Sequence, residues 1–330
     1  MRAGARPGAG ARTAADVGAA AADVVTSSGE PAAATKPDPM GTPAAIAAVA
    51  ALARRPGRLL VVADFDGTLA EGSRDPGAAT IVPLARRALR RLAGVAVARP
   101  ERVAVAILTG RTAADVAGRV RVGGVTYLGD HGLQAGTYPR GGHPSGLVTT
   151  YRPGHEASVE PAGILATRVP EVLGQPAWLF VERKGPSVAF HVRQADDRVA
   201  ARAAVEAAIE RVDRELPPHE LRHYRGRLVV DLRPRSAGGK REAFEELLAR
   251  IRPATVVAFG DDVSDADGFA VLRGARSAGT CDGLAVAVTG PHGMPDEVRA
   301  AADVHLDTPF AAARALSALA TELERDPGPG

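Results

Sequence analysis

The architecture of this chain follows from one segment, Leu59-Leu60-Val61-Val62-Ala63-Asp64-Phe65-Asp66-Gly67-Thr68-Leu69. Its first half is an uncharged apolar run, which predicts a strand buried on both faces, as in a parallel sheet. Side chains alternate along an extended chain, so Asp64 and Asp66 point to one side and Phe65 to the other. Two carboxylates therefore meet just beyond the strand's C-terminal end, the edge where ligands bind in open α/β sheets.

An isolated Asp-x-Asp would ordinarily be interpreted as an Asx-rich turn that caps the next helix. Here the pair directly follows an apolar strand, and Gly67 permits a sharp exit that lets both acids reach one centre. The complete string therefore favours chemistry over capping.

Three further apolar runs follow this strand, with helical patterns between them. This alternation predicts βαβ units. The runs lie at residues 103–108, 125–128 and 255–259. From about residue 140 to 232 the rhythm changes to longer alternating strands around an Ala-rich helix, which predicts an antiparallel α+β domain inserted into the first. The predicted fold is α/β, a Rossmann-like core with a parallel sheet and an inserted α+β cap. The predicted boundaries are 43–138 and 233–324 for the core, 139–232 for the cap, and 1–42 and 325–330 for disordered tails.

Composition narrows the class of protein. The 330 residues are 45% apolar and 24% charged, enough for one large core or two moderate ones. A single cysteine, Cys281, excludes an internal disulfide framework and a Cys-rich zinc site. Neither a membrane helix nor a secretory signal is recognisable, so we expect a soluble cytoplasmic protein. The net charge of +3, scattered arginines and 4% aromatics argue against nucleic-acid binding.

An acidic segment follows the apolar run at residues 255–259. It reads Gly260-Asp261-Asp262-Val263-Ser264-Asp265-Ala266-Asp267, and such charge density repels itself unless a cation is present. The EF-hand pattern fails because Val263 and Gly274 would occupy ligand positions 1 and 12. A magnesium site shared with Asp64 fits better, because Mg²⁺ takes one or two carboxylates, water and phosphate oxygens. Whether Asp262 or Asp265 also contacts the metal stays open.

Two further segments supply groups that suit a phosphate. The run at residues 103–108 ends in Thr109-Gly110-Arg111, a hydroxyl and free backbone N–H groups at the same sheet edge, although a threonine there is also an ordinary N-cap. Lys240 follows Gly238-Gly239 at a helix start and is one of only three lysines among 41 basic residues. A lysine so placed can meet phosphate as a compact point charge.

Together, these four segments resemble the motifs of the haloacid dehalogenase-like (HAD) phosphatases, in the family's order. The resemblance covers about residues 57–320. It implies that Asp64 attacks phosphorus to form an aspartyl-phosphate and that Asp66 acts as the acid and base. It also implies that Thr109 and Lys240 hold phosphoryl oxygens. The implied Mg²⁺ ligands are Asp64, the Asp66 carbonyl and Asp261, with Asp265 close by.

The predicted insert offers a polar face. In residues 181–193, Gly185-Pro186 suits a hairpin turn, and alternation places Glu182 and Lys184 on one face. On the partner strand, residues 188, 190 and 192 share the apolar face, whereas Ser187, His191 and Arg193 share the other. Such a face suits a ligand with several hydroxyls, and an ordinary half-solvated sheet is the alternative.

This hairpin, with residues 129–132 and 230–234, resembles the trehalose-6-phosphate phosphatase family. The resemblance implies that Glu182, Lys184 and Arg193 bind the disaccharide phosphate, and we expect Arg111, His131 and Asp231 to contact it too. His131 either faces the cleft or hydrogen-bonds a loop carbonyl. The chain departs from the family's usual residues at a few places. These are Asp231 for Glu, Asp130 for Asn or Ser, Val192 for an aromatic, Ser264 for Thr and Gly268 for Ala.

The resulting expectation is a Mg²⁺-dependent phosphatase that hydrolyses trehalose 6-phosphate. A HAD phosphatase for another sugar phosphate, such as a sucrose or glucosylglycerate phosphate, is one alternative. A sugar-phosphate-binding regulatory module without turnover is another, although a pure binder would gain little from the Asp64 and Asp66 pair. We expect a monomer that binds a small-molecule sugar phosphate, neither nucleic acid nor membrane, with a separate trehalose-phosphate synthase as the possible protein partner.

Overall fold

The computed structural model of this chain describes residues 42–325, apart from 73–75, 226–227 and 291–292. The two predicted tails lie outside the described residues, except for Thr42 and Arg325. Thr42 begins helix α1 and Arg325 ends helix α9. No helix within the described ranges combines the length and apolar character that crossing a bilayer requires.

The larger sheet of the described chain has eight strands in the order β12-β11-β10-β1-β2-β3-β4-β5. The strands are β1 (Leu59–Ala63), β2 (Val103–Leu108), β3 (Thr126–Gly129), β4 (Gln134–Thr137), β5 (Val148–Tyr151), β10 (Thr255–Gly260), β11 (Asp282–Val288) and β12 (Val304–Leu306). From β12 to β3 all neighbours are parallel, and β4 and β5 are antiparallel. Every apolar run that predicted a strand forms one, so the predicted α/β class with a mostly parallel sheet is confirmed.

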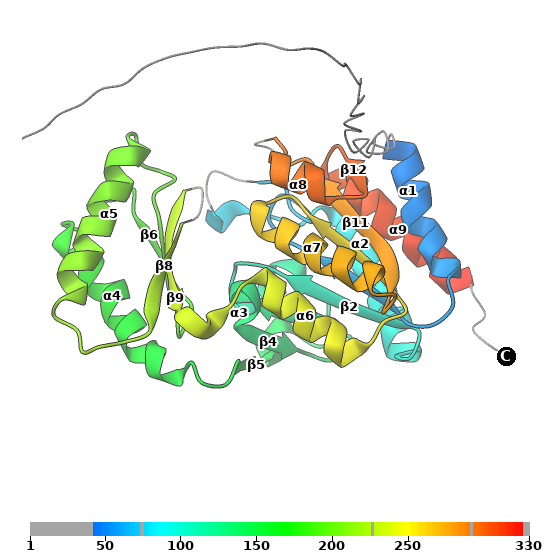
Figure 1. Cartoon of the computed structure of the whole chain (residues 1–330), viewed down its shortest axis with the longest axis horizontal. Helices are drawn as coiled ribbons and strands as arrows, with labels where there is room; N and C mark the ends of the chain where they lie inside the picture. The colour runs from blue at the N-terminus through cyan, green and yellow to red at the C-terminus, as the bar shows by residue number, and fades with distance from the viewer. Residues whose placement is uncertain (1–41, 73–75, 226–227, 291–292, 326–330) are drawn as a thin grey trace, which may run out of the picture. The chain divides into compact units, whose positions relative to one another are not determined.

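Helices cover both faces of this sheet (Figure 1). They are α1 (Thr42–Ala51), α2 (Pro83–Ala98), α3 (Ala113–Val120) and α9 (Pro309–Arg325) on one face, and α6 (Lys240–Ile251), α7 (Val263–Ser277) and α8 (Asp296–Ala301) on the other. Strand β1 shows why helices are needed on both faces of the sheet. Leu59 and Val61 enter one apolar cluster, whereas Leu60 and Val62 enter the other, so each face of the strand is buried.

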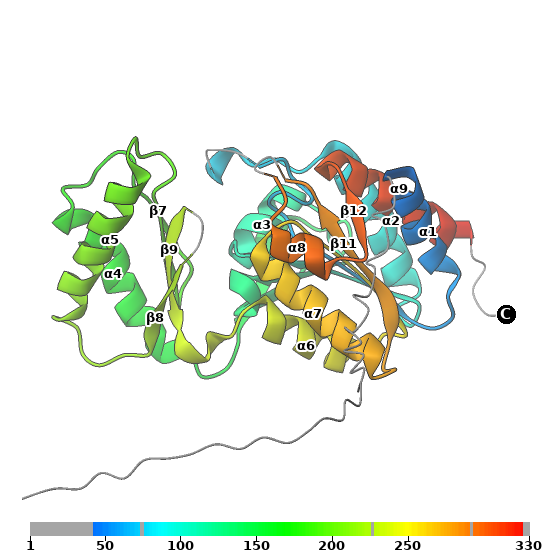
Figure 2. The same cartoon turned by 45° about the horizontal axis from the view of Figure 1, so that its top comes forward.

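A second, antiparallel sheet has the order β6-β7-β9-β8. Its strands are β6 (Phe180–Arg183), β7 (Val188–His191), β8 (Leu221–Arg225) and β9 (Val229–Pro234). Helices α4 (Val159–Val172) and α5 (Arg198–Asp213) pack on one face of it (Figure 2). Val188, Phe190 and Val192 enter this apolar cluster, the face that alternation assigned to them. The opposite face is free to carry polar side chains.

The boundaries of the predicted cap stay a prediction. Strand β5 lies within the segment 139–232, and yet it pairs with β4 in the larger sheet. The chain enters the smaller sheet only at β6 and leaves it at β9, which is followed by α6.

Candidate active site

The site begins where β1 ends. The Asp64 N–H donates to the Phe259 carbonyl at 3.0 Å, which continues the pairing of β1 with β10. Phe65 is buried in the core, so its neighbours Asp64 and Asp66 project from the sheet edge. Gly67 adopts a φ of +81°, and a Cβ there would overlap the Asp261 carboxylate. The sharp turn therefore requires glycine and brings the ends of β1 and β10 together.

Three carboxylates converge at this edge. Asp64, Asp261 and Asp265 each offer one oxygen, and these oxygens lie within 4.8 Å of one another. Lys240, the first residue of α6 and only 4% exposed, donates to Asp64 Oδ1 at 2.8 Å and to Asp265 Oδ1 at 2.7 Å. Burial lowers the pKa of Lys240, but the anionic Asp265 and Asp64 raise it above its usual value. The ammonium is therefore charged, and it holds two of the three acids in place.

One ammonium leaves this cluster short of positive charge. Burial raises the pKa of Asp64 to about 8 against the attraction of Lys240, with Asp265 raising it further. Burial, then Asp64 and Asp265, raise the pKa of Asp261 well above its ordinary value. Crowded, buried carboxylate oxygens with a deficit of cations fit a hard divalent ion such as Mg²⁺.

Asp265 and Asp262 of the acidic segment differ in role. The second oxygen of Asp265 accepts the N–H groups of Asp261 and Asp262 at 3.2 and 3.1 Å, so Asp265 orients the loop. Asp262 is exposed and accepts the Val263 N–H at 2.8 Å as the N-cap of α7. The side chain of Asp262 therefore caps a helix, whereas that of Asp265 belongs to the cluster.

Asp66 is held by a bidentate ion pair. Arg111 donates from Nε to Asp66 Oδ2 at 2.6 Å and from Nη2 to Asp66 Oδ1 at 2.8 Å. The third arm of Arg111 reaches Asp115 Oδ2 at 2.8 Å. Thr109 is buried beside this pair, and its Oγ1 accepts the Arg111 N–H at 3.3 Å. In this arrangement Arg111, predicted to contact substrate, positions Asp66.

The smaller sheet contributes Lys184, which is 4% exposed. Its Nζ donates to the Gly110 carbonyl of the larger sheet's edge at 2.9 Å. Carboxylates of Asp130, Glu182 and Asp231 surround it at 3.6, 3.8 and 3.8 Å. Burial raises the pKa of Glu182, but the charge of Lys184, the hydrogen bond and charge of His191 and the charge of Arg111 together outweigh burial and lower that pKa to about 2. Lys184 thus bridges the two sheets and keeps Glu182 ionised.

Two more contacts join the β6–β7 hairpin to the larger sheet. Ser187 donates its hydroxyl to the fully buried Asp130. Gln134 donates to the Lys184 carbonyl at 2.8 Å and accepts the Ala113 N–H at 2.8 Å. Burial, opposed by Lys184 and reinforced by Asp231, raises the pKa of Asp130 to about 6. The hairpin turn is therefore anchored on the end of β3 and the start of α3.

A single cavity of about 480 Å³ collects the predicted site residues from both sheets. Those that line it are Asp64, Asp66, Thr109, Arg111, His131, Glu182, Lys184, Arg193, Asp231, Lys240 and Asp261. Asp265 lies behind Asp64 and Lys240 and lines a small adjoining hollow. His131 Nε2 lies 4.0 Å from Asp231 Oδ2. Burial, followed by the charge of Arg233, holds the pKa of His131 well below its usual value, so a neutral imidazole faces the cavity.

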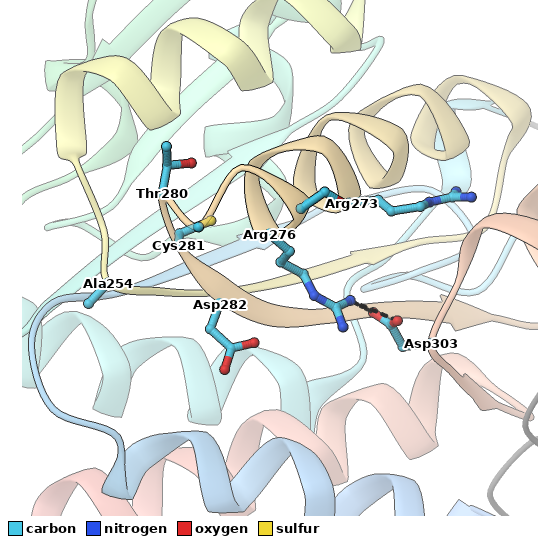
Figure 3. Close-up of a pocket in the computed structure, with 9 residues that line it drawn as sticks. Ala254, Arg273, Arg276, Thr280, Cys281, Asp282 and Asp303 are labelled. Atoms are coloured by element: carbon cyan, nitrogen blue, oxygen red, sulfur yellow. Dashed lines mark hydrogen bonds and ion pairs between the residues drawn. The ribbon is translucent and has the colours of Figure 1, made fainter.

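A larger, open hollow of about 780 Å³ lies at the opposite edge of the sheet (Figure 3). It is bounded by Ala254, which precedes β10, and by Asp282, which begins β11. Arg276 there is neutralised by Asp303 at 2.8 Å. Cys281 packs against the apolar cluster beneath α6 and α7. The predicted site residues all lie at the other edge.

Comparison with known proteins places the chain in a family. The model of the trehalose-phosphatase family matches residues 62–292, more than half of the chain. The chain belongs to the trehalose-phosphatase family. All four motif segments and the hairpin of the smaller sheet fall inside the matched range.

Individual relatives agree with the family. A trehalose-phosphate phosphatase of Mycobacterium avium is 35% identical over 271 residues, 80% of this chain. The chain spans 63% of that relative's length. The C-terminal domain of Candida albicans trehalose-6-phosphate phosphatase is 20% identical with a TM-score of 0.62, over 86% of this chain and 97% of that one. The C-terminal domain of a Candida albicans trehalose synthase regulatory protein is 12% identical with a TM-score of 0.57, over 84% and 98%. These two structures show the shared fold.

Two residues of this family member's site escaped the sequence analysis. Asp115 binds Arg111, and its N–H donates to the hydroxyl of Thr112, the N-cap of α3. Its spacing of four from Arg111, at the start of a helix, was a usable signal. Gln134 gave no such signal, because its partners Ala113 and Lys184 lie 21 and 50 residues away.

Proposed function

We propose that this chain is a Mg²⁺-dependent phosphatase that hydrolyses trehalose 6-phosphate to trehalose and phosphate. The observation that carries the proposal is the contact of Asp64 with Lys240 beside Asp261, in a cavity that residues of the smaller sheet also line. Family membership supports both the reaction and the substrate.

In the first step, an Asp64 carboxylate oxygen bonds to phosphorus while the bond from phosphorus to the sugar oxygen breaks. Asp66 gives a proton to the departing sugar oxygen. For this, one of its oxygens must leave Arg111, which pairs with both in this structure, while the other oxygen keeps the carboxyl oriented. In the second step, water attacks phosphorus, Asp66 takes the water's proton, and Asp64 is released with inorganic phosphate. Lys240 and Thr109 hold phosphoryl oxygens while charge builds on them.

A bound Mg²⁺ would be held by Asp64, Asp261 and the Asp66 carbonyl, the ligands that the family resemblance implies. Asp265 would position the loop. It would offset the negative charge of the acids and of the phosphoryl group. Asp64 must be ionised to attack, and burial opposes this by raising its pKa to about 8. A divalent cation beside Asp64 would favour the ionised form.

We propose that side chains of the smaller sheet bind the sugar hydroxyls. Glu182, Asp231 and Arg193 line the cavity with charged groups that pair well with hydroxyls, and Lys184 lies between two of them. The proposal includes a monomer in the cytoplasm that receives its substrate from a separate trehalose-phosphate synthase. A charged sugar phosphate stays on the side of the membrane where it is made.

The alternative function that a specific observation supports is a phosphatase for another sugar phosphate. Asp231 is shorter than the family's usual Glu, and its Oδ1 is buried without a hydrogen-bond partner among the described residues. That oxygen could serve a hydroxyl of another sugar. A regulatory module is the other rival, because the fold also occurs in a protein named as regulatory.

Phosphate release from a panel of sugar phosphates, with Mg²⁺ and with chelator, tests the proposal. We expect trehalose 6-phosphate to give the highest kcat/KM, and both chelation and Asp64→Asn to abolish turnover. Asp267→Asn is the matched control, because Asp267 is exposed in the same acidic segment, and it should keep wild-type activity. Turnover that survives Asp64→Asn would refute the aspartyl-phosphate route, and a stronger substrate elsewhere in the panel would replace trehalose 6-phosphate.

A further inference from the structure

The polar face of the smaller sheet ends in a row in which the apolar Phe180 and Val229 flank His191. Phe180 of β6 pairs with His191 of β7, and His191 pairs with Val229 of β9, so these side chains stand side by side. All three line the cavity. The Phe180 side chain is 46% exposed although it is large and apolar, and its ring centroid lies 5.5 Å from that of His191. His191 is in turn fixed by Glu182 at 3.1 Å.

This row lies at a defined distance from the residues that we expect to bind the phosphate. Alternation along β6 and the residue after it places Lys184, Glu182 and Phe180 on the face opposite the apolar cluster that Val181 contacts, and all three line the cavity. Lys184 touches Gly110, next to Thr109, so its end of the strand adjoins the proposed phosphate position. Each step of two residues advances about 7 Å along a strand. Phe180 therefore lies two such steps from the Lys184 end.

We propose that Phe180, with His191 and Val229, forms a subsite for the second sugar ring of a disaccharide phosphate. This inference rests on the proposed function and deepens it. The ring that carries the phosphate would meet the charged row of Glu182 and Asp231. The next ring would reach the row of Phe180, where the C–H face of a pyranose packs against an aromatic face. A monosaccharide phosphate ends before Phe180, so the row selects for a substrate with two rings.

The test compares trehalose 6-phosphate with glucose 6-phosphate on the full-length protein, in the wild type and in Phe180→Ala. We expect KM for trehalose 6-phosphate to rise about tenfold, equal to about 1.4 kcal/mol. We expect KM for glucose 6-phosphate to change less than about twofold. Phe180→Tyr keeps the aromatic face and should keep the preference. Phe310→Ala removes a phenylalanine of similar exposure, 53%, that does not line the cavity, and should behave as wild type.

The outcomes separate this inference from the proposed function. A wild type that prefers trehalose 6-phosphate, with Phe180→Ala unchanged, would overturn the subsite and leave the proposed function standing. Equal losses on both substrates in Phe180→Ala would assign the side chain a structural role and also overturn the subsite. A wild type that hydrolyses glucose 6-phosphate as well as trehalose 6-phosphate would overturn both proposals.

Discussion

Replacing Lys240 with methionine should destabilise the protein far more than any surface lysine replacement would. Methionine keeps most of the apolar stem but removes the ammonium that contacts Asp64 at 2.8 Å and Asp265 at 2.7 Å. Both carboxylates are nearly fully buried and would be left without this cation. Breaking a buried ion pair on one side costs more than the pair contributes, because an uncompensated charge stays behind.

The size of the effect follows from these contacts. Coulomb's law at an effective dielectric constant of about 20 gives roughly 6 kcal/mol for each contact at this separation. Burying the ammonium also costs desolvation free energy, which offsets much of this attraction. The methionine variant does not have this cost. Losses of about 3–5 kcal/mol are typical when one partner of a buried pair is removed. We therefore expect the free energy of unfolding to fall by about 3–5 kcal/mol in buffer without divalent ions.

Urea denaturation at pH 7.5 measures this difference, with Arg241→Met as the matched control. Arg241 is the next residue, is half exposed, and pairs with Glu245 at 3.3 Å. Such a surface pair contributes less than about 1 kcal/mol. Adding Mg²⁺ should raise the denaturation midpoint of Lys240→Met more than that of the wild type, because the ion meets a larger deficit of positive charge. A Lys240→Met variant as stable as Arg241→Met would refute the charge balance described for the site.

Further predictions concern the groups around this centre. Arg111→Lys removes the bidentate hold on Asp66 and should lower kcat about tenfold or more while KM changes little; an unchanged kcat in steady-state assays would contradict the positioning role. Lys184→Ala should raise KM for trehalose 6-phosphate more than for a small phosphate ester, and equal effects would remove Lys184 from the sugar site. The raised pKa of Asp130, about 6 against 3.8, means that the fold prefers its protonated form. Its contribution to stability is present below pH 3.8 and is lost as pH rises through 6, a change of at most about 3 kcal/mol. Asp130→Asn should remove this part of the pH dependence in denaturation curves between pH 4 and 6, and superimposable wild-type and variant profiles would contradict it.

The local part of this architecture was predictable from the sequence. The apolar run before Asp64 reports a strand buried on both faces, and period-two alternation correctly assigned Val188 and Phe190 to the packed face of the smaller sheet. Parallel strands end at one edge, so the convergence of Asp64 with Asp261 followed from the order of the runs. These features depend on neighbours along the chain or on simple sheet geometry.

What escaped prediction depends on contacts between distant segments. The sequence of β5 does not indicate that this strand pairs with β4 in the larger sheet, because its apolar and polar residues alternate only weakly. The strand is also largely exposed, so it needs no strong apolar pattern. Likewise, Arg111 could have met substrate as well as Asp66, which lies 45 residues away. The contact of Lys184 with the Gly110 carbonyl spans 74 residues. Tertiary packing selects these partners, within the larger sheet for β5 and Arg111 and between the two sheets for Lys184.

The position of a bound divalent ion tests the central claim most directly. Mn²⁺ accepts the same oxygen ligands as Mg²⁺ and scatters X-rays anomalously. Crystals grown with Mn²⁺ should show one strong anomalous peak in contact with the carboxylates of Asp64 and Asp261, with Lys240 still bound to Asp64. No peak at saturating Mn²⁺, or a peak away from these two side chains, would contradict the account.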